Sequence, residues 1–363
     1  MTNVLPVAFV SSHGQLGGSE KVLEDLIKGL DPRDVSGVIV LQEGPLVEKL
    51  RDNGVPTQVI PTSGSRVAVL GTARELRRRL KPLAPHVIHA NGVKAAIVCV
   101  LATRKVPVVW MKHDVSFDGK IGRSIAARCA AIAGVSEEVL RSLSDRTKTT
   151  VVHPGVSVDQ RAAEHDGAEL KRSLRLSRHV VSVIGRLEPS KGHGEALETL
   201  PAISAEVGEV NLLLVGGDDE NHPGIRSALR QRAEELGCSD QVYLLSHTPA
   251  PAVIAASDVV VVPTVPSASG QGREGFGLVA AEALSLGTPV VAYRVGATEE
   301  VLGECGVLVA PADRAALAAG ITKLLVEEAL RLRLADCGRT RARAFSVEKM
   351  VGQMTEIYRR VAS

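Results

Sequence analysis

Residues 270–291 read Gly-Gln-Gly-Arg-Glu-Gly-Phe-Gly-Leu-Val-Ala-Ala-Glu-Ala-Leu-Ser-Leu-Gly-Thr-Pro-Val-Val. The four glycines in the first half of this stretch permit positive φ and close backbone approach, whereas Leu278–Leu286 contains good helix formers and no proline. The pattern predicts a glycine-rich loop that opens a helix. Because the free N–H groups at such a helix start bind anions or hydroxyl oxygens, the stretch is the first candidate for a ligand site.

Two carboxylates, Glu274 and Glu282, flank the predicted helix start. At a rise of ~1.5 Å per residue, a mostly helical segment separates them by roughly 12 Å, which fits the two ends of a nucleotide sugar. Cations elsewhere in the chain are better placed for the phosphates. The backbone amides of Phe276, Gly277 and Leu278 are therefore expected to bind the hydroxyl groups of the sugar.

The composition is that of a globular protein with two domains of ordinary size. The chain has 363 residues, of which 45% are hydrophobic and 23% charged. A net charge of +2 shows no bias toward nucleic acid, so the expected partner is a small molecule, with at most peripheral membrane contact. The first residues lack the features of a secretion signal and no apolar span is long enough to cross a membrane, which predicts a cytoplasmic protein.

The five cysteines are scattered along the chain, at Cys99, Cys129, Cys238, Cys305 and Cys337. Their odd number and the absence of Cys-x-x-Cys spacing argue against a disulfide framework. They are expected to be reduced and mostly buried.

Short apolar runs alternate with helical patterns in both halves of the chain, which is typical of parallel sheets. In the first half the runs are Val4–Ser11, Gly37–Leu41, Gln58–Pro61, Val87–Ala90, Val106–Met111, Ile132–Val135 and Val151–Val156, and in the second half His179–Gly185, Val210–Val215, Val242–Leu245, Val259–Pro263, Pro289–Tyr293 and Gly306–Val309. The polar segment Ser157–Arg178 resembles a linker. The pattern predicts an α/β protein with two Rossmann-like, doubly wound domains at 1–165 and 166–345, followed by a helix at 346–363 for which Ser346 is the N-cap.

The first apolar run ends in the loop Ser12-His13-Gly14-Gln15-Leu16-Gly17-Gly18-Ser19-Glu20, and a helical pattern follows. Strand, glycine loop and helix is the arrangement that cradles phosphates, so Gly17 and Gly18 are candidate donor-binding positions. The Gly-x-Gly-x-x-Gly fingerprint is absent, and a bare glycine turn is common in α/β folds. A purely structural turn is therefore the alternative.

His113 follows another apolar run of the first half, at the edge where open α/β sheets bind ligands. A structural histidine is the alternative. Between these sites, Thr72–Leu83 carries five cations beside a leucine stripe. This segment is either a solvated helix face or a surface that meets an acidic acceptor or an anionic surface.

Gly185–His193 reads Gly-Arg-Leu-Glu-Pro-Ser-Lys-Gly-His and follows the first apolar run of the second half. Arg186 offers a planar fork and Lys191 a compact charge, so the two are expected to bind one diphosphate, a surface turn being the alternative. A neighbouring pair, Asp218 and Asp219, suggests a metal only weakly. Because protein cations make a metal redundant and no metal-ligand spacing occurs, no metal is expected.

The sequence lacks a convincing nucleophile arrangement, since Gly-x-Ser-x-Gly is absent. The charged groups instead suit electrostatic catalysis, in which cations and helix starts stabilise a departing diphosphate.

Over essentially its full length, the chain resembles the retaining family-4 glycosyltransferases of the GT-B fold. The matching motifs are Gly17-Gly18-Ser19-Glu20, His113, Gly185-Arg186-Leu187 with Lys191-Gly192, Glu274-Gly275-Phe276-Gly277-Leu278 through Glu282, and Gly296-Ala297-Thr298-Glu299-Glu300-Val301. The resemblance implies two Rossmann-like domains that face an interdomain cleft, with the last helix crossing back to the first domain.

The resemblance also implies roles for individual residues. Arg186 and Lys191 would stabilise the leaving diphosphate, Glu274 and His113 would contact the donor sugar, and Glu282 would bind the ribose. Backbone groups near Leu245 and Ser246 would meet the base, with Gly185 and Gly275 completing the donor site. The implied reaction moves a hexose from a nucleotide-diphosphate sugar with retention, without metal or cofactor, and the leaving phosphate helps take the acceptor's proton.

Several alternatives stay open. Ala297 replaces the usual second glycine, and Pro266–Arg273 is either a lid that closes on the donor or a tolerated insertion. The base, sugar, pathway and oligomeric state are not predicted. The aromatic content of 2% favours a small-molecule, natural-product or lipid-linked acceptor over a long glycan. A nucleotide-sugar epimerase, a phosphorylase or a non-catalytic nucleotide-sugar-binding module on the same architecture is the alternative function.

Overall fold

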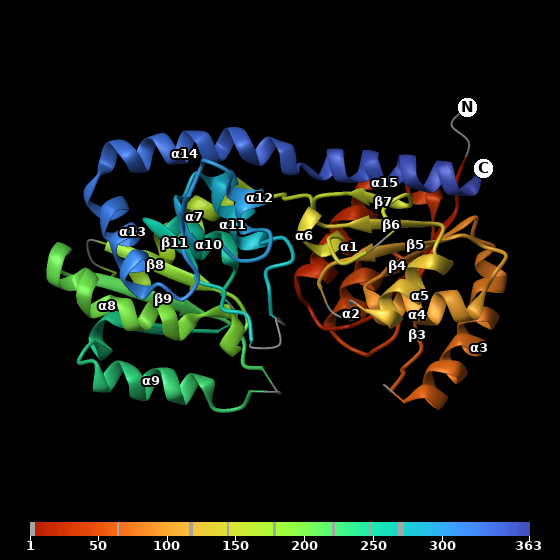
Figure 1. Ribbon diagram of the computed structural model, residues 1–363, viewed down its shortest axis with the longest axis horizontal. Coiled ribbons are helices and arrows are strands. Elements are labelled where there is room, and N and C mark those ends of the chain that lie inside the picture. The colour runs from red at the N-terminus through yellow and green to blue at the C-terminus, as the bar shows by residue number, and fades with distance from the viewer. Residues whose placement is uncertain are drawn as a thin grey trace. The chain divides into compact units, whose positions relative to one another are not determined.

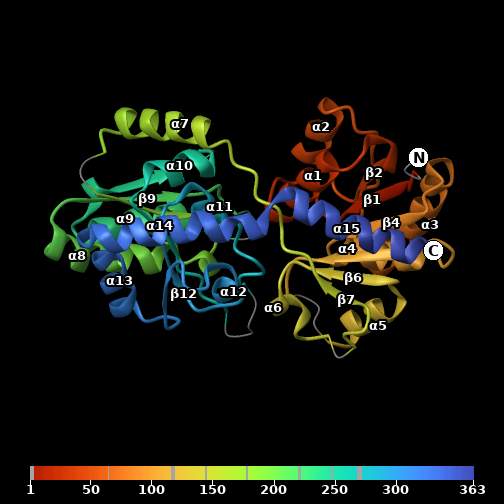
Figure 2. The ribbon, with the colours of Figure 1, turned by 90° about the horizontal axis from the view of Figure 1, so that it is seen from above.

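The computed structural model describes residues 4–63, 65–115, 119–143, 145–176, 179–219, 222–246, 248–267 and 272–363. The chain divides into two compact units (Figure 1, Figure 2): Met1–Gly155 together with Ser346–Ser363, and Val156–Phe345. The final segment, which contains Ser346, therefore belongs to the same unit as the first half of the chain.

The first unit is built on a seven-stranded parallel sheet in the order β3-β2-β1-β4-β5-β6-β7. Its strands are β1 (Val7–Ser11), β2 (Val35–Val40), β3 (Thr57–Val59), β4 (Val87–Asn91), β5 (Val108–Lys112), β6 (Ala131–Gly134) and β7 (Thr149–Val151). Its helices are α1 (Gly18–Gly29), α2 (Pro45–Asp52), α3 (Arg66–Leu83), α4 (Val93–Ala102), α5 (Lys120–Arg128), α6 (Glu137–Leu140) and α15 (Val347–Ala362), with the 3-10 helix η1 (Pro32–Asp34). The strand order reverses between β1 and β4, which makes this pair the switch point of the sheet.

The second unit repeats this plan with a six-stranded parallel sheet in the order β10-β9-β8-β11-β12-β13. Its strands are β8 (His179–Ile184), β9 (Val210–Val215), β10 (Val242–Leu245), β11 (Val259–Val262), β12 (Val290–Tyr293) and β13 (Val307–Val309). Its helices are α7 (Gln160–Ser173), α8 (His193–Val207), α9 (Ile225–Glu235), α10 (Ala250–Ala256), α11 (Leu278–Leu286), α12 (Thr298–Leu302), α13 (Arg314–Val326) and α14 (Glu328–Ala342), with η2 (Pro189–Lys191), η3 (Ser239–Gln241) and η4 (Arg343–Phe345). Here the switch point lies between β8 and β11.

The apolar runs of the sequence form these strands because buried parallel strands need hydrophobic residues on both faces. All five residues of β1 and all six of β9 are buried. The prediction of an α/β protein with two Rossmann-like sheets is confirmed. The predicted cap of the last helix is also present, since the side chain of Ser346 accepts a hydrogen bond of 3.2 Å from the Lys349 amide.

The prediction of a linker at Ser157–Arg178 is wrong, because most of this segment is α7. Its first turn is capped by Asp159, whose side chain accepts from the Ala162 amide. Ala163 and Gly167 are buried against α10, and a Cβ on Gly167 would lie 3.0 Å from the Ala252 carbonyl oxygen. Small residues four apart let the helices approach closely, which the polar composition of the rest of α7 conceals.

The boundary between the units accordingly differs from the one expected at residue 165. That position falls inside α7, which packs on α10 of the second unit, and the units instead divide after Gly155. The last strand of the first sheet also ends earlier than expected, at Val151 rather than Val156.

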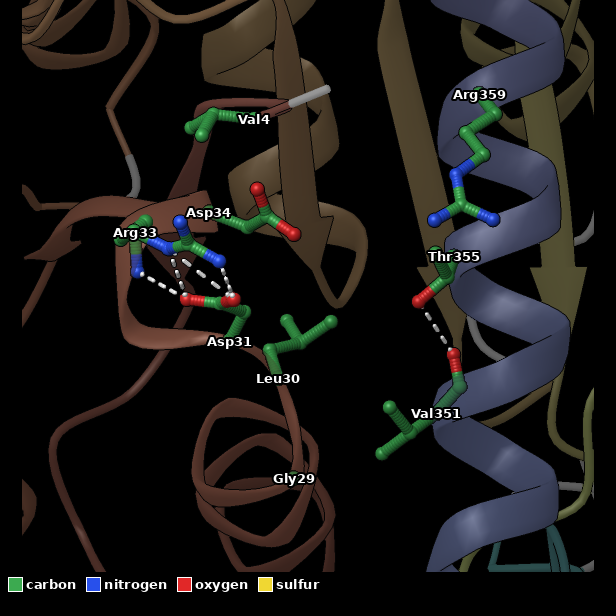
Figure 3. Close-up of a pocket in the computed structure, with 9 residues that line it drawn as sticks. All are labelled: Val4, Gly29, Leu30, Asp31, Arg33, Asp34, Val351, Thr355 and Arg359. Carbon is green, nitrogen blue, oxygen red and sulfur yellow. Dashed lines mark hydrogen bonds and ion pairs between the residues drawn. The ribbon is translucent and has the colours of Figure 1, made fainter. Parts of the chain in front are cut away.

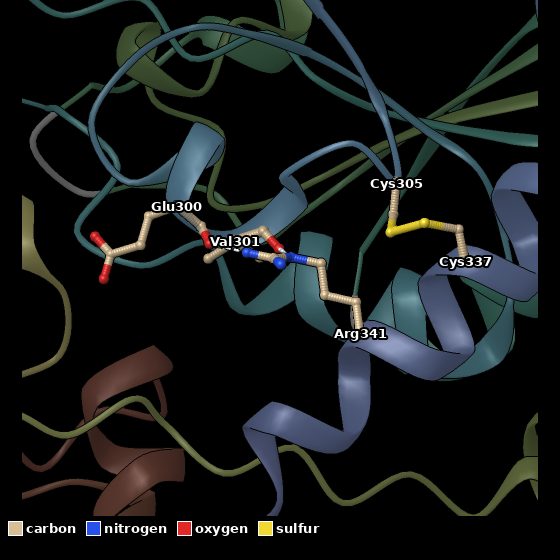
Figure 4. The surroundings of a disulfide bond; sticks show 5 residues. All are labelled: Glu300, Val301, Cys305, Cys337 and Arg341. Atoms are coloured by element: carbon tan, nitrogen blue, oxygen red, sulfur yellow. Dashed lines mark hydrogen bonds between the residues drawn. A yellow bond between two sulfur atoms is a disulfide. The ribbon is translucent and has the colours of Figure 1, made fainter.

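The expectation that all cysteines are reduced is wrong for two of them. Cys305 and Cys337 form a disulfide, although 32 residues separate them (Figure 4). The Arg341 guanidinium on the same helix, α14, donates to the carbonyl oxygens of Glu300 and Val301. The disulfide and this arginine together attach α14 to the segment around α12. The other three cysteines, Cys99, Cys129 and Cys238, are free and buried as expected.

None of the helices in the described part of the chain is both long enough and apolar enough to cross a membrane. The expected cytoplasmic location stays a prediction.

Candidate active site

The switch point of the second sheet is organised by Gly192. Its φ is +69°, and a Cβ there would lie 1.9 Å from the Pro263 carbonyl oxygen. Only glycine fits a left-handed position with so close a backbone neighbour. The loop after β8 and the loop after β11 are also joined by a hydrogen bond of 2.9 Å from the Val265 amide to the Ser190 carbonyl. Lys191, which precedes Gly192, is thereby fixed at the carboxyl end of β8.

Lys191 forms an ion pair with Glu274. The ammonium Nζ lies 3.0 Å from Glu274 Oε2, and the side chains are 27% and 14% exposed. The hydroxyl of the buried Thr264 donates to the same oxygen, at 3.3 Å. Two sequence-predicted residues, 83 positions apart, are therefore brought together in a partly dry environment where electrostatic interactions are strong.

Thr264 was missed by sequence reasoning. Its signal is a hydroxyl residue that follows the buried strand β11 by two positions, at the edge where open sheets bind ligands.

The backbone of Glu274 is held by the turn after β12. The Ala297 amide donates to the Glu274 carbonyl at 2.9 Å, and a Cβ on Gly296 would lie 2.1 Å from that same oxygen. Gly296 has φ of +63°, so glycine is required there. Ala297 has φ of −87° and is buried, so the departure from a second glycine costs nothing in backbone strain.

Helix α11 begins only at Leu278, after Gly277 in a left-handed conformation with φ of +96°. Glu274 therefore lies outside the helix, and the separation of roughly 12 Å expected from helical rise does not apply. Glu282 is buried on α11. The helix start has no side-chain cap, which is consistent with a role for its amides in ligand binding.

Phe276 has a structural side chain. The ring is buried and packs edge-on against Phe345, with centroids 5.3 Å apart. Of this residue, only the backbone remains a candidate for substrate contact. Gly275 lies beside it in the loop. Residues 268–271 of the expected lid, including the Gly270 that begins the glycine-rich stretch, lie outside the described residues.

Arg186 is placed differently from Lys191. Its side chain is 64% exposed, and its guanidinium lies 3.1 Å from Glu188 and 4.0 Å from Asp219. The loop that carries it is held by Gly216, where a Cβ would lie 1.9 Å from the Gly185 carbonyl oxygen. The site thus contains Lys191, which is held by Glu274, and Arg186, whose side chain is mostly exposed and pairs with Glu188.

Strand β10 pairs with β9 on the side away from β8, and its end carries the two residues predicted to meet the base. The Leu245 carbonyl accepts from the Gly216 amide at 2.9 Å, and the Ser246 carbonyl accepts from the Thr248 hydroxyl at 3.4 Å. Ser246 itself is exposed. The two residues follow the same sheet edge as Gly185, and their predicted role toward a base is not tested by these contacts.

The two aspartates after β9 have protein partners. Asp218 pairs with Arg226 at 2.9 Å, and Asp219 bonds with His222 at 2.9 Å. A different cluster, His165, Asp166 and Glu169, lies on the exposed face of α7. Exposed acidic clusters are common, so neither group is assigned to a metal.

Asn91 connects the two loops at the switch point of the first sheet. Its backbone carbonyl accepts from the Ser12 hydroxyl at 2.8 Å, and its side-chain Nδ2 donates to the Ser19 carbonyl at 3.2 Å. Its Oδ1 lies 2.6 Å from Nε2 of His113, which follows β5. Sequence reasoning missed this bridge, because nothing in the sequence shows which neighbour Asn91 meets.

These contacts define the tautomer of His113. Because Asn91 Nδ2 faces a carbonyl, the opposite atom Oδ1 must be the one that faces the histidine, and it can only accept. His113 Nε2 therefore carries the hydrogen. Burial lowers the pKa of His113 to about 4, so the ring is neutral at pH 7 and Nδ1 is its acceptor. A neutral acceptor can receive a hydrogen bond from a substrate hydroxyl.

A second buried histidine lies behind this site on β4. His89 Nδ1 lies 2.7 Å from the Tyr358 hydroxyl of α15. Burial lowers the pKa of His89 to about 3, reinforced at acid pH by repulsion from a protonated His113, and burial raises the pKa of Tyr358. This contact attaches the C-terminal helix to the sheet of the first unit.

The glycine loop after β1 is organised by Gly14 rather than Gly17. A Cβ on Gly14 would lie 2.2 Å from the Gln42 carbonyl oxygen, so glycine is required there. Gly17 precedes Gly18 at the start of α1 and has an extended φ of −137°, which other residues adopt. The predicted role of Gly17 and Gly18 toward phosphates is not tested by these contacts.

A cavity of about 220 Å³ lies elsewhere in the first unit, between the end of α1 and α15 (Figure 3). Two of its charged lining residues form an ion pair, since the Arg33 guanidinium lies 2.7 Å from the Asp31 carboxylate. Hydrogen bonds from Arg33 lower the pKa of Asp31 to about 2. The cavity adjoins the loop that leads into the amino end of β2, away from His113 and Asn91.

The sequence models of two protein families match consecutive parts of the chain. "Glycosyltransferase Family 4" matches residues 16–160, and "Glycosyl transferases group 1" matches residues 178–327. Together they cover most of both units.

Curated relatives include a D-inositol 3-phosphate glycosyltransferase of Corynebacterium glutamicum, 31% identical over 225 residues, or 59% of this chain and 52% of the relative. The enzyme of the same name from Mycobacterium tuberculosis is 32% identical over 230 residues, or 60% of this chain and 45% of the relative. The chain spans about half the length of these relatives.

Solved structures reproduce the fold over nearly the whole chain. Anabaena HepE in complex with UDP and glucose has a TM-score of 0.83 at 24% identity, covering 97% of this chain and 98% of that one. A glycosyltransferase from Rickettsia africae has a TM-score of 0.84 at 18% identity, covering 99% of both chains. The matched family descriptions and this fold lead to one conclusion: the chain belongs to the family-4 glycosyltransferases and has the GT-B fold.

Proposed function

We propose that the protein is a retaining, metal-independent glycosyltransferase, which moves a hexose from a nucleotide-diphosphate sugar to the hydroxyl of an acceptor. The observation that supports this most is the Lys191–Glu274 pair at the β8/β11 switch point, where a cation for phosphate and a carboxylate for sugar hydroxyls meet. The names of the relatives and the family membership point the same way.

In the proposed reaction, the bond between the anomeric carbon and the diphosphate oxygen breaks, and a bond from that carbon to the acceptor oxygen forms on the same face. The acceptor's proton passes to the leaving phosphate oxygen. The products are the glycoside and the nucleoside diphosphate. No separate protein base is needed, which agrees with the lack of a nucleophile motif.

Lys191 and Arg186 would stabilise the negative charge that develops on the leaving diphosphate. Lys191 is fixed by Gly192 and needs little rearrangement, whereas the exposed Arg186 would leave Glu188 when phosphate arrives. Preorganised charge of this kind makes the largest single contribution to the rate enhancement in many enzymes. Glu274 would bind sugar hydroxyls, together with the amides of Phe276, Gly277 and Leu278, and Glu282 would bind the ribose.

In the first unit, His113 would accept a hydrogen bond from a hydroxyl of the sugar through Nδ1, and Gly17 and Gly18 would approach the phosphates. The cleft expected between the units stays a prediction. So does the role of Leu245, Ser246 and Gly185 in binding the rest of the donor.

The solved neighbour with UDP and the names of the curated relatives suggest which substrates to test first. We propose a uridine diphosphate sugar as donor and a small phosphorylated polyol, such as an inositol phosphate, as the first acceptor to test. Lipid-linked and natural-product acceptors follow in the same screen.

The test measures nucleoside diphosphate release with donor and acceptor panels for the wild type, Glu274→Ala and Arg186→Ala. Loss of one charge-assisted contact to the transition state is expected to slow turnover by tens to thousands of times. Arg232→Ala is the matched control, because Arg232 pairs with Glu198 on the surface, outside the candidate site. Rates like the wild type in both site variants would overturn the proposal.

Two further measurements address the mechanism. The anomeric configuration of the product, read by NMR coupling constants, is expected to match that of the donor. Turnover is expected to persist after treatment with a chelator, and a loss that added Mg²⁺ restores would contradict metal independence.

A further inference from the structure

A cavity of about 550 Å³ in the first unit lies between the end of α3 and the segment that joins α4 to β5. This volume is within the range of small-molecule sites. Four cations line it, Arg77 and Lys81 from α3 and Arg104 and Lys105 from the segment after α4. Its other lining residues are mainly apolar, and Asp and Glu do not occur among them.

The cavity is separate from the candidate active site. Helices α3 and α4 lead into the amino ends of β4 and β5, whereas Asn91 and His113 lie at the carboxyl ends of the same strands. Because all strands of this sheet are parallel, the cavity and these two residues lie at opposite edges. The proposed glycosyl transfer does not use it.

The lining cations differ from their neighbours on the same helix. Arg78 and Arg79 both pair with Glu75, at 2.6 and 2.7 Å. Within the described ranges, Arg77, Lys81, Arg104 and Lys105 have no carboxylate partner. These four side chains are exposed, so water screens part of their mutual repulsion, and a bound anion would relieve the rest.

Helix ends account for part of this charge but not for all of it. The carboxyl ends of α3 and α4 both lie at the cavity, and each carries the equivalent of about −0.5 charge. Two helix ends therefore offset about one of the four positive charges. The excess that remains suits a ligand with at least one full negative charge.

Apolar lining residues indicate that the ligand also has an apolar part. Leu80 is buried beneath it, and Leu101 lies in its wall with 40% of its surface exposed. A fully hydrated anion gains nothing from these side chains, whereas an alkyl group covers them favourably.

We propose that this cavity binds the phosphate group of an amphiphile, a phosphate ester with an apolar chain. The phosphate lies among Arg77, Lys81, Arg104 and Lys105, and the first carbons of the chain lie over Leu80 and Leu101. The same chemistry is offered by a soluble phosphate ester and by the head group of an anionic lipid in a bilayer.

The test titrates the full-length protein with monomeric dihexanoylphosphatidylglycerol by calorimetry, at low and at physiological salt. One saturable site per chain is expected. Dihexanoylphosphatidylcholine, which lacks net charge, and inorganic phosphate, which lacks the chain, are each expected to bind at least tenfold more weakly. Equal binding of inorganic phosphate would overturn the apolar half of the proposal.

The variant Arg77→Glu/Lys105→Glu is expected to lose at least tenfold in affinity, and Leu101→Gln is expected to weaken the lipid but not inorganic phosphate. The matched control is Arg78→Glu/Arg79→Glu, which makes the same change in net charge beside Arg77 on α3 but leaves the lining intact. An equal loss in the control would show non-specific electrostatics and overturn the site. Circular dichroism and the thermal midpoint confirm that each variant is folded.

Sedimentation with vesicles distinguishes the sources of the phosphate. Binding to phosphatidylglycerol vesicles that the lining variant loses and the control keeps would identify a bilayer as the source. Binding of monomeric dihexanoylphosphatidylglycerol without binding to vesicles would identify a soluble ester as the source. Absence of binding in both arms at low salt would refute the proposal without affecting the proposed glycosyl transfer.

Discussion

The ammonium of Lys191 lies 3.0 Å from Oε2 of Glu274, which joins the loop after β8 to the glycine-rich loop before α11. The two residues act as a unit, because removal of either leaves the other partly buried and without its charge partner. In the proposed function, a bound donor would contact both residues, its phosphate at Lys191 and its sugar hydroxyls at Glu274.

Lys191→Ala and Glu274→Ala are therefore expected to slow turnover each by tens to thousands of times, on the order of 2–4 kcal/mol. The double variant should lose much less than the product of the two single losses, since the residues are in direct contact. Steady-state rates for the four proteins of this cycle measure the coupling. Strict additivity would contradict a shared role.

Gly192→Ala is expected to destabilise the second unit and to reduce turnover. The left-handed backbone costs alanine about 1–2 kcal/mol, and a Cβ at 1.9 Å from the Pro263 carbonyl forces the two loops apart. Gly237 is the matched control, because its φ of +67° is nearly the same and its Cβ would meet nothing within 4 Å. Urea unfolding compares the two variants. A loss in Gly192→Ala no larger than in Gly237→Ala would show that the contact with Pro263 is unimportant.

Asn91→Asp is expected to raise the pKa of His113 from about 4. The carboxylate still accepts from Nε2, but its negative charge favours the imidazolium form. NMR titration of the histidine ring protons measures the shift, and the rate should fall at the acid side because Nδ1 then carries a proton. Asn53→Asp, at the exposed C-cap position that follows α2, is the control. An unchanged His113 titration would refute the assigned contact.

Stability is expected to fall as the pH drops from about 7 to 5. Burial lowers the pKa values of His89 to about 3 and of His113 and His193 to about 4, below the value of about 6.5 in an unfolded chain. The unfolded state therefore binds more protons in this window, so the stability that is complete above pH 6.5 is lost on acidification. Each histidine contributes a slope of up to about 1.4 kcal/mol per pH unit.

Urea midpoints at several pH values measure this slope. Replacement of the exposed His165 by glutamine serves as the control and should leave the slope unchanged. A flat profile between pH 7 and 5 would contradict the buried, neutral state of these histidines.

Reduction of the Cys305–Cys337 disulfide is expected to destabilise the second unit by about 4 kcal/mol, the entropic value for a loop of this length. Urea unfolding with and without a reductant measures the difference. Cys305→Ser/Cys337→Ser should unfold at the same midpoint under both conditions. An equal effect of the reductant on that variant would assign the change to another thiol.

Local patterns determined much of this protein before any packing was known. The buried apolar runs predicted both parallel sheets, because strands covered on both faces need hydrophobic residues throughout. The helix Leu278–Leu286 and the cap at Ser346 followed from glycine, helix propensity and side-chain capping, which act over a few residues.

Features that depend on contacts across the chain were decided only by the tertiary structure. The polar composition of α7 concealed a helix because its fully buried positions are two small residues, Ala163 and Gly167, with Leu170 packed against the core beside them. The disulfide joins cysteines that the sequence leaves 32 residues apart, and the tautomer of His113 depends on Asn91 and Ser19. The sequence alone predicted Lys191 and Glu274 as candidates for binding a nucleotide sugar. Their pairing, and the contact of Thr264 with Glu274, required folding, because hydrogen bonds and ion pairs depend on distances that sequence separation does not set.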